Sequence, residues 1–283
     1  MGAAFFMRRN VPSQSAFGWD LLPAPSPLVG LTVDGKAVVS ASFQLQDLAA
    51  TADSCTAEYA IGDAQGLTLT IVVEPAGNDS LAVRASVANQ GPQPRRVSLV
   101  APRLGPYRLS AEAPAAHYLV PKRGAAFDNR PCNYRERYCG LFPLQFLDTF
   151  SPADGRGLSL RTEDTDCAWK HYLLEKTDAD FNVAVEYAEQ MLSPGERFQT
   201  PRAVIQLTDG FWLRGFSAYR EWLETVYQPA SPRQPWFREV FNFRQRFLYW
   251  ADPLVKPGDT RVNLQPALDE ARAELGGLEY LHI

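Results

Sequence analysis

The sequence has little of what several large classes of protein require. It contains 4 cysteines and 3 histidines among 283 residues. No apolar run approaches the ~20 residues that a membrane-spanning helix needs. The 28 Lys and Arg residues are outnumbered by 32 Asp and Glu residues, which gives a formal net charge of −4. Nucleic acids and anionic membranes select clustered positive charge, so we expect neither as a partner.

The scarce cysteines and histidines also limit metal and cofactor chemistry. Cys132 and Cys139 bracket the segment CNYRERYC and could form a local disulfide in an oxidising compartment. Reduced, mostly buried thiols are the favoured interpretation for all four cysteines. The histidines are far apart in sequence, and a metal site would need more ligands than they supply. We therefore predict no metal and no cofactor.

The N-terminal sequence MGAAFFMRRNVPSQ does not fit a signal peptide. Its apolar stretch is short, and the positive charges of Arg8 and Arg9 follow it instead of preceding it. The sequence therefore predicts a cytoplasmic protein, or a secreted one that has lost an upstream leader.

Most of the chain alternates apolar and polar residues with period 2, which is typical of half-buried strands. Residues 1–30 are rich in proline and predict an irregular arm. From residue 31 short strands follow one another between Gly, Pro and Asn turns, and Asp34-Gly35 is a strong hairpin signal. The number of strands exceeds an immunoglobulin-size domain. We therefore predict a large antiparallel two-sheet sandwich, a supersandwich, over residues 31–208.

The period changes to that of a helix after residue 208. Asp209 is a candidate N-cap for an amphipathic helix, and a proline-rich linker follows, so residues 209–235 are predicted to close the sandwich. In residues 236–283 a helix ends at Gly276-Gly277, and LEYLHI then predicts one buried strand. That strand has no expected partner after residue 230, so we expect the natural protein to continue.

Two stretches carry a family resemblance. They are YLVPKRGAAFDNRPCNYRERYCGLFPLQFLDTFSPADGRGLSLRTED and DGFWLRGFSAYREWLETVYQPASPRQPWF. Both resemble multidomain glycoside hydrolases similar to the endo-α-N-acetylgalactosaminidase class. The resemblance implies a galactose mutarotase-like supersandwich, followed at LEYLHI by the first strand of a truncated (β/α)8 (TIM) barrel. In such families the catalytic carboxylates lie on middle barrel strands, which this chain lacks, so no catalytic residue is assigned.

The resemblance suggests two places that could bind substrate. His282 ends the expected first barrel strand, where a side chain would face the sugar, although a histidine in a broken strand is the favoured interpretation. The segment DNRPCNYRERYCG is the most polar and least β-like part of the sandwich. Its Arg130, Arg135, Arg137 and Tyr138 suit sugar hydroxyls and ring faces. The competing and favoured interpretation is an Arg–Glu network that fixes a long loop.

Two further clusters have ordinary interpretations. Glu163, Asp164 and Asp166 lack the spacing of a calcium loop, so a solvated turn is favoured. An aromatic run beyond the linker invites a sugar-stacking role, but core or domain-interface packing is favoured. It consists of Trp236, Phe237, Phe241, Phe243, Phe247, Tyr249 and Trp250.

The sequence thus predicts the non-catalytic N-terminal portion of a glycoside hydrolase-like protein. Its partners would be carbohydrate and its own missing C-terminal barrel. A self-standing carbohydrate-binding or structural β-sandwich is the alternative. A mutarotase-like epimerase is a third and weaker hypothesis, because it needs a histidine–carboxylate pair and only His117 and His171 lie within the sandwich.

Overall fold

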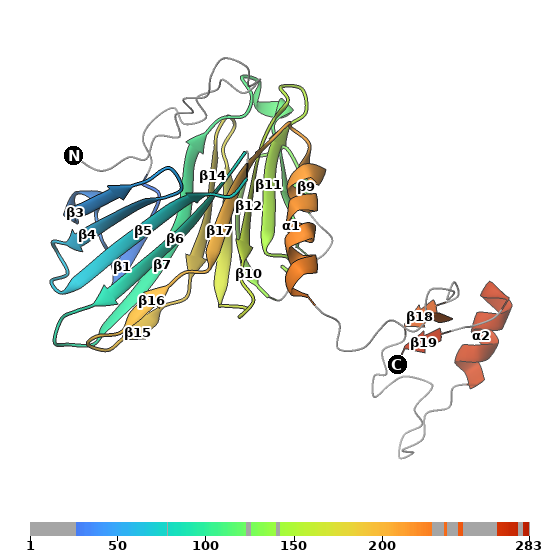
Figure 1. Cartoon of the computed structure of the whole chain (residues 1–283). Helices are drawn as coiled ribbons and strands as arrows, with labels where there is room; N and C mark the ends of the chain where they lie inside the picture. Colours follow the sequence, from blue (N-terminus) through green and yellow to red (C-terminus); the bar gives the residue numbers. More distant parts are fainter. Residues whose placement is uncertain are drawn as a thin grey trace. The chain divides into compact units, whose positions relative to one another are not determined.

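The computed structural model describes residues 27–227, except residues 78, 123–125 and 140–141, and four later segments, 235–236, 243–245, 265–276 and 280–282. Most of the predicted N-terminal arm is outside the described residues. The chain forms two compact units, Met1–Tyr227 and Gln228–Ile283 (Figure 1).

The first unit contains a seven-stranded antiparallel sheet. Its order is β10-β13-β14-β7-β1-β2, and β15 also pairs with β7. The strands are β1 (Gly30–Val33), β2 (Lys36–Ala37), β7 (Arg95–Tyr107), β10 (Cys132–Tyr138), β13 (Lys170–Lys176), β14 (Phe181–Tyr187) and β15 (Gln190–Leu192).

The second sheet of this unit has ten antiparallel strands. Its order is β3-β4-β5-β6-β17-β12-β11-β8-β9, and β16 also pairs with β6. The strands are β3 (Phe43–Ala50), β4 (Cys55–Ile61), β5 (Leu67–Pro75), β6 (Ser80–Asn89), β8 (His117–Val120), β9 (Ala126–Asp128), β11 (Phe146–Ser151), β12 (Arg156–Glu163), β16 (Arg197–Gln199) and β17 (Arg202–Thr208). Two short 3-10 helices, Ser40–Ser42 and Ala113–Ala115, lie between strands.

The core lies between the two sheets. Alternate side chains of each strand point inward, as the period-2 pattern requires, and apolar residues from both sheets form one buried cluster. The cluster includes Leu99 and Val183 from the seven-stranded sheet, and it includes Leu69 and Leu160 from the ten-stranded sheet. The predicted antiparallel sandwich is therefore confirmed.

The predicted hairpin at Asp34-Gly35 is also confirmed. Both residues have positive φ, 49° and 78°, and they connect β1 to β2. A two-residue turn of this kind needs positive φ at both central positions, which Asp and Gly tolerate.

Helix α1 (Trp212–Val226) covers part of the outer face of the ten-stranded sheet (Figure 1). Its Phe216 and Tyr219 pack on Phe146, and Phe150 and Leu119 belong to the same apolar cluster. The predicted N-cap is wrong. Phe211 occupies that position and makes no side-chain capping bond. The carboxylate of Asp209 instead accepts a hydrogen bond from Arg214 Nη1, at 3.3 Å.

Gly215 lets α1 approach the sheet closely. A Cβ atom at this position would lie 2.6 Å from Ser159 Cβ and 2.7 Å from Asp148 Oδ2. Any larger residue would push the helix away from β11 and β12, so the sequence uses glycine in mid-helix despite a cost of about 1 kcal/mol relative to alanine.

Asp148 lies beneath this contact. It is fully buried, and among the described residues neither of its side-chain oxygens has a hydrogen-bond partner. Burial raises the pKa of this carboxyl group well above the ordinary value, because a buried carboxylate loses its hydration. Burial therefore favours the protonated form.

The second unit consists of β18 (Phe243–Gln245), α2 (Gln265–Leu275) and β19 (Tyr280–His282). Gly276 follows α2 with φ 74°, as the C-cap signal predicted. The expectation that LEYLHI lacks a partner after residue 230 is wrong, because β19 pairs in parallel with β18. The sequence signal for β18 was obscured because this strand lies within an aromatic and basic run.

Asp148→Asn should change how stability depends on pH. The unfolded chain ionises Asp148 near the ordinary pKa of about 3.9, whereas the folded chain does so only at higher pH. Stability is therefore lost as the pH rises above the ordinary value, by about 1.4 kcal/mol for each unit of pKa difference. Urea unfolding should show that the stability of the variant relative to the parent increases as the pH rises above about 4. Parallel stability curves would contradict the buried, protonated carboxyl group.

Candidate functional site

The polar segment that the sequence indicated as a long loop is largely a strand. β10 (Cys132–Tyr138) forms an edge of the seven-stranded sheet and pairs with β13 along its whole length. Its residues alternate between half-buried and exposed. The sequence did not show this alternation because a charged residue, Glu136, occupies one of the half-buried positions, where apolar residues are expected. Its carboxylate pairs with Lys122 at 3.3 Å.

Charged side chains of β10 meet a histidine and a carboxylate from the neighbouring strands. Arg135 Nε donates to Glu186 Oε2 at 2.8 Å, and His171 Nδ1 lies 3.8 Å from the same oxygen. Burial, followed by the positive charge of Arg135, lowers the pKa of His171 more than Glu186 raises it. The imidazole is therefore neutral near pH 7 and offers both a donor and an acceptor.

An exposed tryptophan completes this group. Trp169 is 58% exposed, and the guanidinium carbon of Arg137 lies 5.3 Å from its ring centroid. We call Arg135, Arg137, Trp169, His171 and Glu186 the Arg–His cluster. Trp169 and Glu186 were missed by sequence reasoning, because only the register of β10, β13 and β14 brings them beside the arginines.

The other predicted binding residues lie elsewhere. Tyr138 has the opposite parity to Arg135 and Arg137 on β10, and its hydroxyl contacts Cys167 Sγ at 3.7 Å. Arg130 precedes the strand and binds Asp128 Oδ2 through Nε at 2.8 Å. His282 belongs to β19 in the second unit, where it pairs with Gln245. The structure thus brings Arg135 and Arg137 together and separates them from Tyr138.

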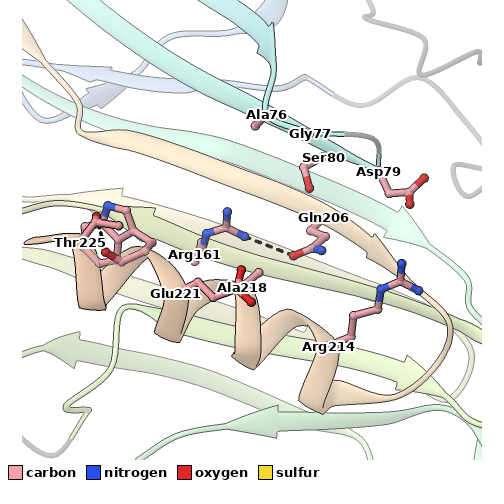
Figure 2. Close-up of a pocket in the computed structure, with 11 residues that line it drawn as sticks. Ala76, Gly77, Asp79, Ser80, Arg161, Gln206, Arg214, Ala218, Glu221 and Thr225 are labelled. Atoms are coloured by element: carbon pink, nitrogen blue, oxygen red, sulfur yellow. Dashed lines mark hydrogen bonds between the residues drawn. The ribbon is translucent and has the colours of Figure 1, made fainter.

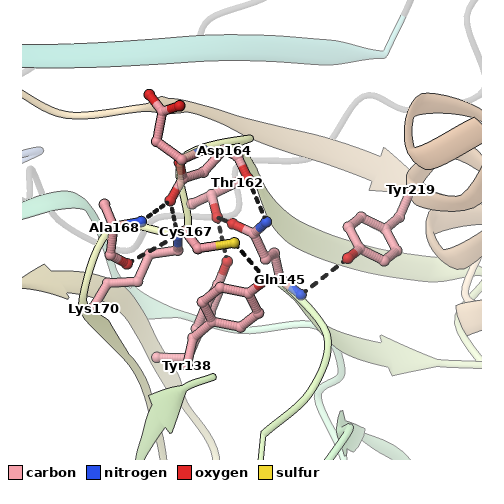
Figure 3. Close-up of polar contacts among 10 residues, drawn as sticks. Tyr138, Gln145, Thr162, Asp164, Cys167, Ala168, Lys170 and Tyr219 are labelled. Atoms are coloured by element: carbon pink, nitrogen blue, oxygen red, sulfur yellow. Dashed lines mark hydrogen bonds and ion pairs between the residues drawn. The ribbon is translucent and has the colours of Figure 1, made fainter. Parts of the chain in front are cut away.

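The acidic cluster is not the solvated turn that the sequence favoured. Asp164 is buried and accepts hydrogen bonds from the backbone N–H groups of Asp166 and Ala168, and it pairs with the fully buried Lys170 (Figure 3). Lys170 Nζ also lies 4.6 Å from the ring centroid of Tyr138. This network holds the β12–β13 connection, and with it Trp169, in place.

The cysteines are free, but two of them are exposed. Cys139 and Cys167 are exposed, and Cys55 and Cys132 are half-buried, so the prediction of mostly buried thiols is wrong. The possible Cys132–Cys139 disulfide is also excluded. These residues are at opposite ends of the extended strand β10, about 20 Å apart at ~3.3 Å per residue, and a disulfide needs Cα atoms within about 7 Å.

A polar groove of about 490 Å³ lies between α1 and the outer face of the ten-stranded sheet (Figure 2). Arg161 and Gln206 come from strands β12 and β17, and Ser80 begins β6. One wall is a stripe of α1, and the other is the β5–β6 turn. The remaining lining residues are Arg214, Ala218, Glu221, Trp222 and Thr225 from α1 and Ala76, Gly77 and Asp79 from the turn.

Within the described residues no three His, Cys, Asp or Glu side chains come together in a way that could hold a metal ion. Likewise, no helix in the described part is long and apolar enough to cross a bilayer. His117 Nδ1 donates a hydrogen bond to Ala115 O at 3.0 Å, and its ring stacks on Phe150. Of the two sandwich histidines, both within the described ranges, His171 is the one that lies beside a carboxylate.

No family model and no curated protein matches this sequence. Solved structures do match. The GH36 α-galactosidase AgaB from Geobacillus stearothermophilus aligns over 90% of this chain and 39% of its own, at 16% identity and a TM-score of 0.50. A variant of the GH36 α-galactosidase AgaA from the same organism, in complex with raffinose, gives the same four values. An α-galactosidase from Lactobacillus brevis covers 70% of this chain and 31% of its own, at 14% identity and a TM-score of 0.49.

What this chain shares with them is the fold. It spans less than two fifths of the length of each of these three proteins. The predicted relation to glycoside hydrolase structures is supported at that level, and the endo-α-N-acetylgalactosaminidase class is not among these three.

Lys170→Met should destabilise the sandwich strongly. It leaves Asp164 buried without its cation, and loss of one partner of a buried ion pair costs about 3–5 kcal/mol. The matched control is Arg130→Met, whose side chain is 81% exposed beside Asp128 and whose loss should cost no more than about 1 kcal/mol. Urea unfolding of both variants measures the difference, and equal effects would show that Asp164 and Lys170 are not buried together.

Proposed function

We propose that this chain is the non-catalytic sandwich portion of a glycoside hydrolase-like protein, whose catalytic carboxylates belong to barrel strands outside the present sequence. The order of the two units carries the proposal. An antiparallel sandwich is followed by the strand–helix–strand unit β18–α2–β19, whose strands are parallel. Parallel strands joined through a helix are the repeating element of a (β/α)8 barrel.

The comparison with AgaB supports this order. Its alignment covers 90% of the present chain, whereas the first unit ends at residue 227 of 283 and therefore contains about four fifths of it. Part of the aligned length therefore falls outside the first unit. In this proposal β18 and β19 would be the first two barrel strands, instead of LEYLHI alone being the first.

The Arg–His cluster is the surface that we propose for carbohydrate contact. An exposed indole with a guanidinium on one side gives a sugar ring an apolar surface, and the neutral His171 and the carboxylate of Glu186 supply hydrogen bonds to hydroxyl groups. The α-galactosidases of the comparison and the endo-α-N-acetylgalactosaminidases of the sequence resemblance act on α-galacto-configured sugars. We therefore propose a galactose-type ligand.

This proposal predicts binding without turnover. The chain should release no nitrophenol from p-nitrophenyl α-D-galactopyranoside, and it should be retarded on immobilised galactose. Trp169→Ala and Arg137→Met should each weaken the retardation about tenfold, since aromatic and arginine contacts dominate such surfaces. Arg220→Met, an equal substitution on the exposed side of α1, is the control and should change nothing.

Two results would contradict the proposal. Turnover that depends on a carboxylate of this chain would show that the chain is an enzyme by itself. Retardation that is absent, or unchanged by Trp169→Ala and Arg137→Met, would remove the Arg–His cluster as the binding surface. If binding is present and a longer protein has no glycosidase activity, the self-standing carbohydrate-binding module becomes the correct description.

A further inference from the structure

The groove beside α1 is a second candidate ligand site, and it lies on the other sheet from the Arg–His cluster. The row of residues beneath α1 explains its origin. Asp148, Ser159, Gln206 and Ser80 are direct cross-strand neighbours on one face of the ten-stranded sheet. The helix covers Asp148 and Ser159 through Gly215, whereas Gln206 and Ser80 line the open groove.

Arg161 is the central group of the groove floor. Its side chain is only 8% exposed. Glu163 Oε1 lies 3.3 Å from both Nε and Nη2, and Gln206 Oε1 accepts from Nη1 at 3.3 Å (Figure 2). A guanidinium has five N–H donors, so within the described part of the chain these three contacts account for three of them and leave two for a ligand. The neighbours fix the side chain in one position before any ligand arrives, which lowers the entropic cost of binding.

The charges around the groove are balanced. Glu163 is shared between Arg161 and Arg202, and Asp209 lies 3.3 Å from Arg214 on the helix wall. Glu221 lines the same wall and attracts Arg161, but burial is the larger effect and lowers the pKa of this arginine. The groove lining thus carries two arginines, Arg161 and Arg214, and two carboxylates, Asp79 and Glu221, so neither sign of charge dominates it.

The remaining lining suits a ligand rich in hydroxyl groups. Trp222 is half-buried, with its ring 5.7 Å from that of Tyr219, and lines the groove. Arg161 and Arg214 bring donors to the lining and Glu221, Ser80 and Gln206 bring acceptors, and a hydroxyl group can use both. The volume is within the ~300–1,000 Å³ range of small-ligand sites.

We infer that this groove binds a neutral oligosaccharide, with Arg161 donating to sugar hydroxyls from the floor and Trp222 contacting a ring from the helix wall. The inference extends the proposed function from one carbohydrate-contact surface to two. It rests on that function for the class of ligand and on different residues for the site.

The test uses the six tryptophans of the chain as reporters. In protein labelled with ¹⁵N-tryptophan, the indole signals of Trp222 and Trp169 are assigned by their loss in Trp222→Phe and Trp169→Phe. Raffinose, maltotriose and cellotriose are titrated separately, each to the limit of its solubility. At least one of them should shift the Trp222 signal until it saturates.

Two variants examine the site itself. Arg161→Met should weaken the saturable shift about tenfold, the value of one hydrogen bond from a charged donor. Because Arg161 is buried and this variant could be unstable, Ala218→Tyr serves as a second one. Ala218 is half-buried on the helix wall, so a tyrosine there fills the groove from that side, leaves the floor intact and should abolish the shift. Arg137→Met, the same substitution on the other sheet, should leave the Trp222 response unchanged.

The outcomes separate this inference from the proposed function. It is overturned if none of the three sugars moves the Trp222 signal, if Ala218→Tyr responds like the parent, or if inorganic phosphate moves the signal and the sugars do not. If the sugars shift the indole signal of Trp169 but not that of Trp222, the groove is ruled out as a site and the Arg–His cluster remains the proposed surface. If the sugars shift only the indole signal of Trp222, the groove site is supported and the Arg–His cluster is ruled out as a binding surface.

Discussion

The close approach of α1 to the ten-stranded sheet at Gly215 is the contact on which both the fold and the groove depend. Because residue 215 has no Cβ atom, the helix lies directly over Ser159 and Asp148. Its aromatic residues then reach the apolar half of the sheet face around Phe146. The helix therefore covers that half and leaves the polar half, with Arg161 and Gln206, as the floor of a groove. Moving the helix outward would remove both the apolar packing and the wall that carries Trp222.

The two candidate surfaces are built in different ways. The Arg–His cluster combines the register of β10, β13 and β14 with a loop that the buried Asp164–Lys170 pair holds in place. The groove instead depends on a helix wall and on a buried arginine that Glu163 and Gln206 position. An open surface with an exposed indole suits the end or side of a long glycan. A walled groove of limited volume suits a few sugar units.

The sequence was sufficient for features that depend on local pattern. Period-2 alternation identified the sandwich, and the pair Asp34-Gly35 located its first hairpin because few residues tolerate positive φ. The sequence was insufficient for features that depend on contacts between residues far apart in the chain. The charges of β10 suggested a loop because their partners, Glu186 and Lys122, are far away in the chain. β18 was missed for the same reason, since its pairing with β19 is visible only once the chain has folded. Arg161 and Trp222, which form the groove, carried no local signal.

A crystal of this protein soaked with raffinose would show whether the polar half of the sheet face beside α1 is a carbohydrate site. We expect electron density for a sugar ring against Trp222, with hydroxyl oxygens within hydrogen-bond distance of the Arg161 guanidinium. Density for the sugar only at the Arg–His cluster, or in neither place, would contradict this expectation.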